Sequence, residues 1–288
     1  MTTAAEATAY TPSERQVARL AYRRARTRRS ILIALLSTVV VAGVIVAVVG
    51  TSSGWPRFRD SFLDLSVGWH DVPALLRALW TNIQIMLISE ACILVLATLV
   101  AVMRTLQGPV FLPLRFLAAL YTDVFRGLPL LIVLLLVGFG LPSLRLAGVP
   151  TSFFVLGIIS LVITYTAYVA EVLRAGIESV HPSQRASARA LGLTYAQSMR
   201  FVVFPQAVRR VMPALLNDFV SLQKDSSLVY VLSVSEMVLT AQNESLSDFK
   251  FVHLVFAGII FVLLTIPLTR LTDYFARRNG WINAGGFL

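Results

Sequence analysis

The sequence predicts an all-α membrane protein with about six transmembrane helices, and three observations support this fold class. Hydrophobic residues make up 57% of the 288-residue chain, charged residues only 14%, and the mean hydropathy is +0.76. Apolar runs long enough to cross a bilayer recur along the chain. The basic residues, which give a net charge of +10, collect between these runs, which argues against nucleic acid as a partner.

The apolar runs place the predicted spans. In chain order we expect them at 31–50, 75–103, 112–141, 153–173, from 208 to a region near 224–227 where the pattern loses clarity, and 251–269. Pro129 and Pro213 lie inside apolar runs, so we expect kinks or breaks there.

These spans divide the chain into five parts. They are a cytoplasmic basic tail (1–30), the first transmembrane helix (31–50), an extracytoplasmic linker (51–74), a core domain with the other five spans (75–278) and a cytoplasmic tail (279–288). Arg28 and Arg29 before the first apolar run are also typical of a twin-arginine export signal. Because no clear cleavage motif follows and five more spans do, we expect this helix to be retained.

The basic residues predict the orientation. With the N-terminus inside, the inner segments hold 18 basic residues and the outer segments hold four. Cytoplasmic loops carry an excess of Lys and Arg, so we expect both termini in the cytoplasm of a multi-pass cell-membrane protein.

The segment of about 178–207, which we call the coupling loop, is predicted to contain two short helices. Ser183 can cap the first, and Gly192 can end it in a left-handed conformation. Thr194 and Gln197 have the spacing of a capping box for the second, which Phe204-Pro205 should end. From the residues alone, a helix pair that only packs on lipid headgroups is equally compatible.

Four ordered segments resemble the permease subunits of bacterial ABC importers, in the polar amino-acid (histidine, glutamine, glutamate and arginine) subfamily, with the glutamate or glutamine type first. They are Arg126-Gly127-Leu128-Pro129, residues 165–177, Ala190-Leu191-Gly192 with Phe204-Pro205-Gln206-Ala207, and Pro213 with Asn217 and Lys224-Asp225-Ser226-Ser227-Leu228. The resemblance covers about 75–278. It implies a type I permease core of five helices behind one N-terminal helix.

The resemblance also implies partners. They are two cytoplasmic ABC ATPase subunits, a second permease subunit that we expect to be a related sister chain, and an extracytoplasmic amino-acid-binding protein. The residues expected to couple to the ATPase are Ser183, Gln184, Ala186, Ala190, Leu191, Gly192, Thr194 and Gln197. One departure is Ala186, which stands where the family usually has Glu, so a specific ion pair is absent at that position.

The chain itself is not expected to be an enzyme. It has no Gly-Lys-Ser/Thr P-loop, so ATP and Mg are expected on the partner subunits, with no cofactor in this chain. The histidines are far apart in sequence, at 70, 181 and 253, which argues against a metal site. The single cysteine, Cys92, excludes an intrachain disulfide, and we expect it to be buried.

Ionisable and polar residues inside spans are candidates for the substrate pathway. Placing them in a membrane costs free energy, so their presence there indicates a function. The pathway candidates are Glu90, Arg126, Asn217, Lys224, Asp225 and Ser226. Glu90 and Lys224 could hold the two ends of a zwitterion, or could pair as structural contacts. Glu171 and Arg174 are three residues apart on one helix and are expected to pair.

Two other function classes stay open at this point. A self-contained ion-coupled transporter would take up solute without ATPase subunits and would usually show two related halves, which this sequence does not. A membrane scaffold would bind a soluble partner and transport nothing. Co-purification with an ATPase whose activity a binding protein stimulates distinguishes the ABC permease from both.

Overall fold

The computed structural model describes residues 13–106 and 108–280, and these are helical with turns and no strand. Residues 1–12 of the predicted N-terminal tail and 281–288 of the predicted C-terminal tail lie outside the described residues. The chain forms two compact units, residues 1–60 and 61–288. The predicted all-α membrane fold is confirmed.

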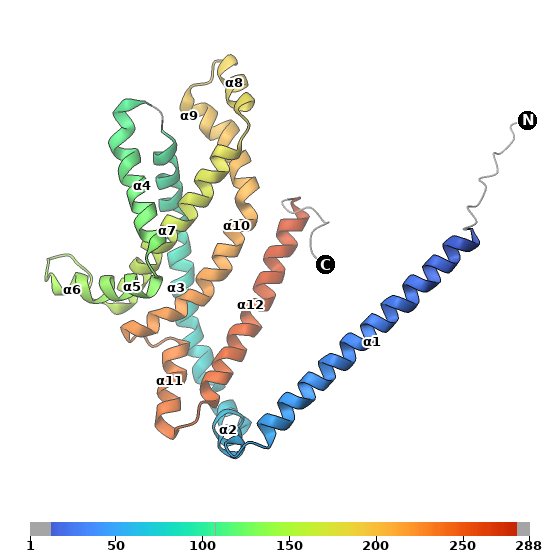
Figure 1. The fold of residues 1–288 in the computed structure, drawn as a ribbon. Coiled ribbons are helices and arrows are strands. Elements are labelled where there is room, and N and C mark those ends of the chain that lie inside the picture. Colours follow the sequence, from blue (N-terminus) through green and yellow to red (C-terminus); the bar gives the residue numbers. More distant parts are fainter. Residues whose placement is uncertain (1–12, 107, 281–288) are drawn as a thin grey trace, which may run out of the picture. The chain divides into compact units, whose positions relative to one another are not determined.

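The first unit consists mainly of α1 (Glu14–Gly50), drawn in blue in Figure 1. Ser13 caps this helix, and its side chain and that of Gln16 form a capping box. The helix therefore begins inside the predicted tail and runs without a break into the predicted first span. Residues Arg26–Gly50 are apolar and long enough to cross a membrane.

The second unit packs its helices around α3 and α7, with α8 and α9 at one end and α11 at the opposite end (Figure 1). Its elements are α2 (Trp55–Phe62, which begins in the first unit), α3 (Leu65–Thr105), η1 (Pro109–Phe111), α4 (Leu112–Gly127), α5 (Leu130–Leu135), η2 (Leu136–Gly140), α6 (Leu141–Ser143), α7 (Phe153–Ser179), α8 (Pro182–Ala190), α9 (Tyr195–Ser198), η3 (Met199–Val203), α10 (Phe204–Asp225), η4 (Ser226–Leu232), α11 (Met237–Asp248) and α12 (Val252–Arg278).

Among the described residues, four helical segments are long and apolar enough to span a membrane, or five if a bent pair counts as one span. The bent pair is Pro109–Gly127 with Leu130–Ser143, at an angle of 107°. Its break falls at Leu128-Pro129, where the sequence predicts one, because Pro129 has no N–H to continue the helix.

The predicted fifth span corresponds to α10, which is continuous but does not have the composition of an apolar span. It carries five charged side chains, namely Arg209, Arg210, Asp218, Lys224 and Asp225. The helix ends at Asp225, where the sequence pattern loses clarity, and a 3₁₀ segment follows. Charges on a helix within a membrane domain face the protein interior or a polar cavity, so α10 is a candidate for a pathway-lining helix.

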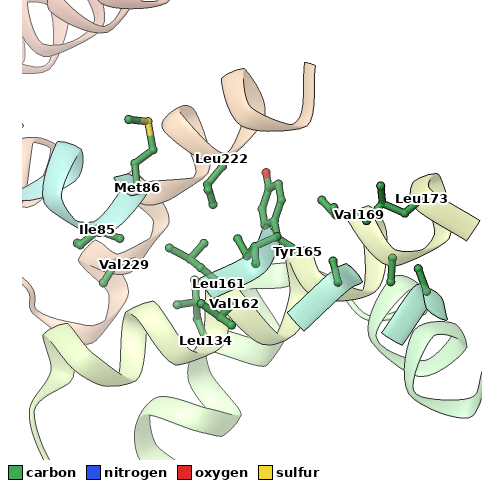
Figure 2. Packing of buried hydrophobic residues seen from close by; sticks show 14 of the residues in the cluster. Ile85, Met86, Leu134, Leu161, Val162, Tyr165, Val169, Leu173, Leu222 and Val229 are labelled. Carbon is green, nitrogen blue, oxygen red and sulfur yellow. The ribbon is translucent and has the colours of Figure 1, made fainter. Parts of the chain in front are cut away.

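The apolar core has two clusters that share α3. The larger one joins the second half of α3 to α5, α7, α10 and η4, and Figure 2 labels ten of its residues. The smaller one joins the first half of α3, at Leu75, to Met237 of α11 and Phe256 of α12. Because α3 belongs to both, it connects the two clusters.

Helices α7 and α10 approach each other closely at Gly176. A Cβ at this glycine would lie 2.6 Å from Val211 Cγ1 and 3.1 Å from the Ala207 carbonyl oxygen. Small residues allow such close backbone contact in membrane proteins, where packing rather than exclusion of water stabilises helix pairs. The end of α7, which leads into the coupling loop, is therefore tightly packed against the start of α10, which follows the loop.

Three details differ from the sequence-based expectations. Phe204-Pro205 does not end the second loop helix, because a π-turn in η3, with Phe204 N–H bonded to the Met199 carbonyl, continues the helix into α10. Cys92 of α3 is exposed on this chain rather than buried. Helix α11 was not predicted, since its start at Glu236 has no common capping sequence.

Candidate functional site

The coupling loop begins with α8, and its cap is not the expected one. His181 is the N-cap: its Nδ1 accepts a hydrogen bond from the Ser183 N–H at 3.2 Å. Pro182 occupies the first helical position, where a missing N–H does no harm. The prediction that Ser183 caps α8 was therefore wrong, although Ser183 lies in the first turn.

Helix α8 ends in a Schellman motif, as the sequence predicts from Gly192. The Leu193 N–H bonds to the Ala188 carbonyl at 3.1 Å and the Gly192 N–H to the Arg189 carbonyl at 2.9 Å, with φ +79° at Gly192. The predicted capping box of α9 is confirmed, with reciprocal hydrogen bonds between Thr194 and Gln197. These local signals fix the bend between the two short helices.

The predicted coupling residues share one property, which is that all of them are exposed on this chain. They are Ser183, Gln184, Ala186, Ala190, Leu191, Gly192, Thr194 and Gln197. Leu191 is 82% exposed at the tip of the bend, whereas Ala188 is buried beneath it. The capped bend therefore holds these side chains in a defined conformation on the surface of this chain, where another protein could contact them.

Hydrogen bonds attach the coupling loop to the helices beside it. Arg185 of α8 donates to the Ile177 carbonyl near the end of α7 at 2.7 Å, and the Arg210 guanidinium of α10 donates to the Ser179 carbonyl. Tyr195 of α9 donates its hydroxyl to the Thr105 carbonyl at the end of α3, at 2.8 Å. The loop is therefore held to three long helices.

Arg126, one of the pathway candidates, belongs to an ion-pair network rather than to a cavity. Its guanidinium lies 3.9 Å from Glu171, which also pairs with Arg104 of α3 and, at 2.5 Å, with Arg174 of α7. The predicted Glu171–Arg174 pair is confirmed. Arg104 and its link to Glu171 were not predicted, because residues 67 positions apart give no local signal.

Asn217 and Lys224 lie together on one stripe of α10, seven residues apart. With Asp273 and several threonines of α12 they line a cavity of about 200 Å³ between α10 and α12. Both side chains are exposed on this chain, and Lys224 forms no ion pair with a described residue. Asn217 and Lys224 are therefore available to a ligand or a second chain.

The other polar stripe of α10 carries Asp218 and Asp225 and faces α3 and α7. Tyr165 of α7 donates its hydroxyl to Asp225 at 2.7 Å, toward the helix that carries Leu222 in Figure 2. Glu90 of α3 is half-buried and near enough to Asp218 for their charges to interact. Glu90 thus groups with Asp218 and Asp225, and these two residues lie on a different face of α10 from Lys224.

Ser226, the remaining pathway candidate, is fully buried in a polar cluster. Asn82 Nδ2 lies 3.5 Å from Ser226 Oγ and donates to the Glu236 carboxylate at 2.8 Å. Glu236 caps α11 through the Leu239 N–H, and Asn82 Oδ1 accepts the Met237 N–H at 3.1 Å. This cluster joins α3 to α11, and sequence reasoning missed Asn82 and Glu236.

The histidines do not all lie apart, contrary to expectation. His70 and His253 line one cavity with Asp71 and Asp248, although the described residues contain no group of three or more such side chains that could hold a metal. Partial burial alone would raise the pKa of the Asp248 carboxyl, but hydrogen bonds from the Lys250 N–H and His253 lower it overall. His253 contacts both aspartates, at 2.7 and 3.0 Å.

Comparisons with known proteins identify the relatives of this chain. The sequence profile of the family described as "Binding-protein-dependent transport system inner membrane component" matches residues 110–280. The chain is 31% identical over 208 residues to the arginine transport system permease protein ArtQ of Bacillus subtilis, covering 72% of this chain and 93% of ArtQ. It is 33% identical over 214 residues to the glutamate/aspartate import permease protein GltK of Escherichia coli O157:H7, covering 72% and 94%.

A solved structure agrees with these relatives. The crystal structure of an amino acid ABC transporter with histidines contains a chain that is 31% identical, with a TM-score of 0.67. The similarity covers 74% of this chain and 97% of that one. This neighbour, like the sequence relatives, belongs to an amino-acid transport system.

Proposed function

Because this chain belongs to the binding-protein-dependent transport system inner membrane components, we propose that it carries a polar amino acid of the glutamate or glutamine type into the cytoplasm. It is the non-catalytic, multi-pass inner-membrane subunit of an ABC importer for polar amino acids, and a separate subunit hydrolyses ATP. Family membership sets aside the ion-coupled transporter and the membrane scaffold. The observation that carries the mechanism is the capped, exposed coupling loop from α8 to α9.

In the proposed mechanism, two cytoplasmic ATPase subunits close on ATP and displace α8 and α9. The movement tilts the helices joined to the loop and opens the pathway outward, where an extracytoplasmic binding protein delivers the amino acid. Hydrolysis then resets the inward-facing state. A related sister permease completes the pathway, and it would supply the carboxylate that Ala186 lacks.

The polar residues of α3 and α10 support a zwitterionic substrate. Lys224 and Asn217 provide an ammonium and an amide that can bind the substrate carboxylate in the cavity between α10 and α12. Glu90 of α3 lies near Asp218, at another face of α10, so its carboxylate would bind the substrate ammonium at a different point of the pathway. A glutamate side chain would add a negative charge near Asp218 and Asp225, whereas glutamine would not. The geometry therefore favours glutamine within the glutamate and glutamine type.

A second candidate is a cationic amino acid. Glu90, Asp218 and Asp225 outnumber Lys224 in this region, and like-charged groups are stabilised by a cation between them. ArtQ, which is named as part of an arginine transport system, has a similar sequence. Arginine would be the substrate instead of glutamine if its guanidinium, rather than its α-ammonium, binds to these three carboxylates.

An uptake assay distinguishes these possibilities. The complete transporter, reconstituted in proteoliposomes with its binding protein, is expected to take up glutamine only with ATP inside, and unlabelled glutamine should compete better than glutamate or arginine. Glu90→Gln should raise KM about tenfold, because it removes a charge-assisted hydrogen bond, while Glu14→Gln at the exposed start of α1 should have no effect.

Each other outcome has a defined meaning. Preferential uptake of arginine would favour the second candidate, and uptake without ATPase subunits would overturn the mechanism. Unchanged KM and rate in Glu90→Gln would remove Glu90 from the pathway.

A further inference from the structure

A connected set of hydrogen bonds and ion pairs runs from the coupling loop to the break between α4 and α5. We propose that Tyr195 and Glu171 are positioning residues that carry movement of the loop to α3 and α4. This inference rests on the proposed function, because it assumes that an ATPase displaces α8 and α9. It assigns roles to two side chains that are neither among the predicted coupling residues nor on the polar stripes of α10.

The first step is the contact between α9 and α3. Thr105 is the last residue of α3, so its carbonyl has no partner within the helix. The Tyr195 hydroxyl, from the first position of α9, donates to this carbonyl at 2.8 Å. A shift of α9 therefore acts on the end of the 41-residue helix that holds the two core clusters together.

The second step is made by the neighbouring residue, Arg104. Its guanidinium pairs with Glu171 of α7 and donates to Thr122 Oγ1 of α4 at 2.8 Å. Thr122 is fully buried, and the Arg104 and Glu171 side chains are only 15% and 20% exposed. Because the pair is largely shielded from solvent, its geometry is better defined than that of a surface ion pair.

The third step leads from Glu171 to Arg126, at 3.9 Å. Arg126 lies in the last turn of α4, directly before the 107° break that precedes α5. Tyr168, one turn before Glu171 on α7, also points its hydroxyl at the Arg126 carbonyl, at 3.4 Å. Glu171 therefore joins the end of α3 to the place where the third span changes direction.

The charges explain why Glu171 is the central member. Three arginines, Arg104, Arg126 and Arg174, surround it, and the other carboxylate, Glu178, pairs with Arg174 at a more exposed position. Removing the Glu171 charge would leave Arg104 and Arg126 to repel each other, which would separate the ends of α3 and α4. Glu178 cannot replace it, since it contacts Arg174 alone among these arginines.

The test uses the complete transporter in proteoliposomes and measures moles of amino acid taken up per mole of ATP hydrolysed, with the amino acid that the wild type transports. Tyr195→Phe removes one hydroxyl and is expected to lower this ratio about three- to tenfold while the binding protein still stimulates ATP hydrolysis. The matched control is Tyr121→Phe, because Tyr121 also donates to a helix carbonyl, that of Ile163 at 2.6 Å, but joins α4 to α7 without reaching the loop. We expect the control to keep the wild-type ratio.

A second variant tests whether the two residues act in one route. Glu171→Gln should lower the ratio at least as much as Tyr195→Phe, and the double variant should fall no further than the worse single variant. If Glu171→Gln does not assemble with its partner subunits, Arg104→Lys replaces it, because a lysine keeps the charge but cannot bridge Thr122 and Glu171 in the same way.

The outcomes separate the inference from the proposed function. A wild type that couples no uptake to ATP hydrolysis overturns both. A working wild type with an unchanged ratio in Tyr195→Phe overturns the inference alone, as does an equal fall in Tyr121→Phe or additive losses in the double variant. A lower amount of assembled transporter with an unchanged ratio would assign these residues to stability only, which also overturns it.

Discussion

At the scale of single residues, Gly192 determines the local conformation of the coupling loop, on which the proposed coupling to the ATPase depends. Its φ of +79° favours glycine, and a Cβ built there would have no heavy atom within 4 Å. Within this chain a substitution therefore acts through the backbone and makes no steric contact. We expect Gly192→Val to strain the bend by about 1–2 kcal/mol and to lower uptake per ATP hydrolysed, measured in proteoliposomes.

Gly192→Asn is the matched control, because asparagine adopts the left-handed conformation much more readily than a β-branched residue. The asparagine variant should keep most of the wild-type coupling. Equal losses in both variants would mean that the side chain meets a partner, and equal retention would mean that the bend does not need its present geometry.

The residues that sequence reasoning identified correctly are those with short-range signals. Gly192 and the Thr194–Gln197 capping box are fixed by spacings of a few residues, and the structure has both. The cap of α8 was assigned to Ser183 because serine is a common cap, yet Pro182 at the first position moves the cap to His181. Contacts such as Arg104 with Glu171 depend on tertiary packing and leave no local pattern.

At the scale of elements, the cluster of Asn82 and Glu236 attaches α11 to α3. Asn82 donates to the buried Glu236 carboxylate and accepts the Met237 N–H, so both functions of one amide are used. Asn82→Ala would leave both groups buried without this partner, and we expect a loss of about 2–4 kcal/mol, since two buried polar groups lose a hydrogen bond.

The measurement is the midpoint of thermal unfolding of the assembled transporter in detergent. Asn243→Ala is the control, because Asn243 is an exposed residue of the same α11. We expect a lower midpoint for Asn82→Ala and no change for Asn243→Ala. Equal midpoints in the two variants would contradict the structural role of the cluster.

Elements with strong apolar runs were the predictable ones. The predicted spans at 31–50 and 153–173 correspond to α1 and α7, and Pro129 marked the break between α4 and α5. Helices α10 and α11 were harder, because the charges of α10 interrupt its apolar pattern and the cap of α11 is an uncommon one, Glu236. In both cases the apolar residues are buried in the core clusters, but charges or an uncommon cap hide the pattern in the sequence.

At the scale of the whole molecule, one feature of the second unit supports the proposal that this chain forms half of a transport pathway. The stripe of Asn217 and Lys224 on α10 is exposed on this chain, although a lysine within a membrane domain needs a polar neighbour. A sister chain would provide that neighbour and close the cavity between α10 and α12. The coupling loop, at the end opposite α11, would then face the ATPase subunits (Figure 1).

The orientation of the molecule gives the last prediction. The 18 basic residues of the predicted inner segments against four outside favour a cytoplasmic coupling loop and cytoplasmic termini. Gln184 is exposed on α8, and Ser247 is exposed on α11 at the opposite end of the unit. With the exposed Cys92 first replaced by alanine, Gln184→Cys should react with a membrane-impermeant thiol reagent only in inside-out vesicles, and Ser247→Cys in intact cells or spheroplasts.

The two positions control each other, since they test opposite ends of one unit with the same chemistry. Labelling of Gln184→Cys from outside would place the coupling loop away from any cytoplasmic ATPase. The proposed mechanism would then fail even if the chain transports an amino acid, because the ATPase subunits could not reach α8 and α9. Labelling of both positions from one side would instead contradict the assignment of α8 and α11 to opposite membrane surfaces.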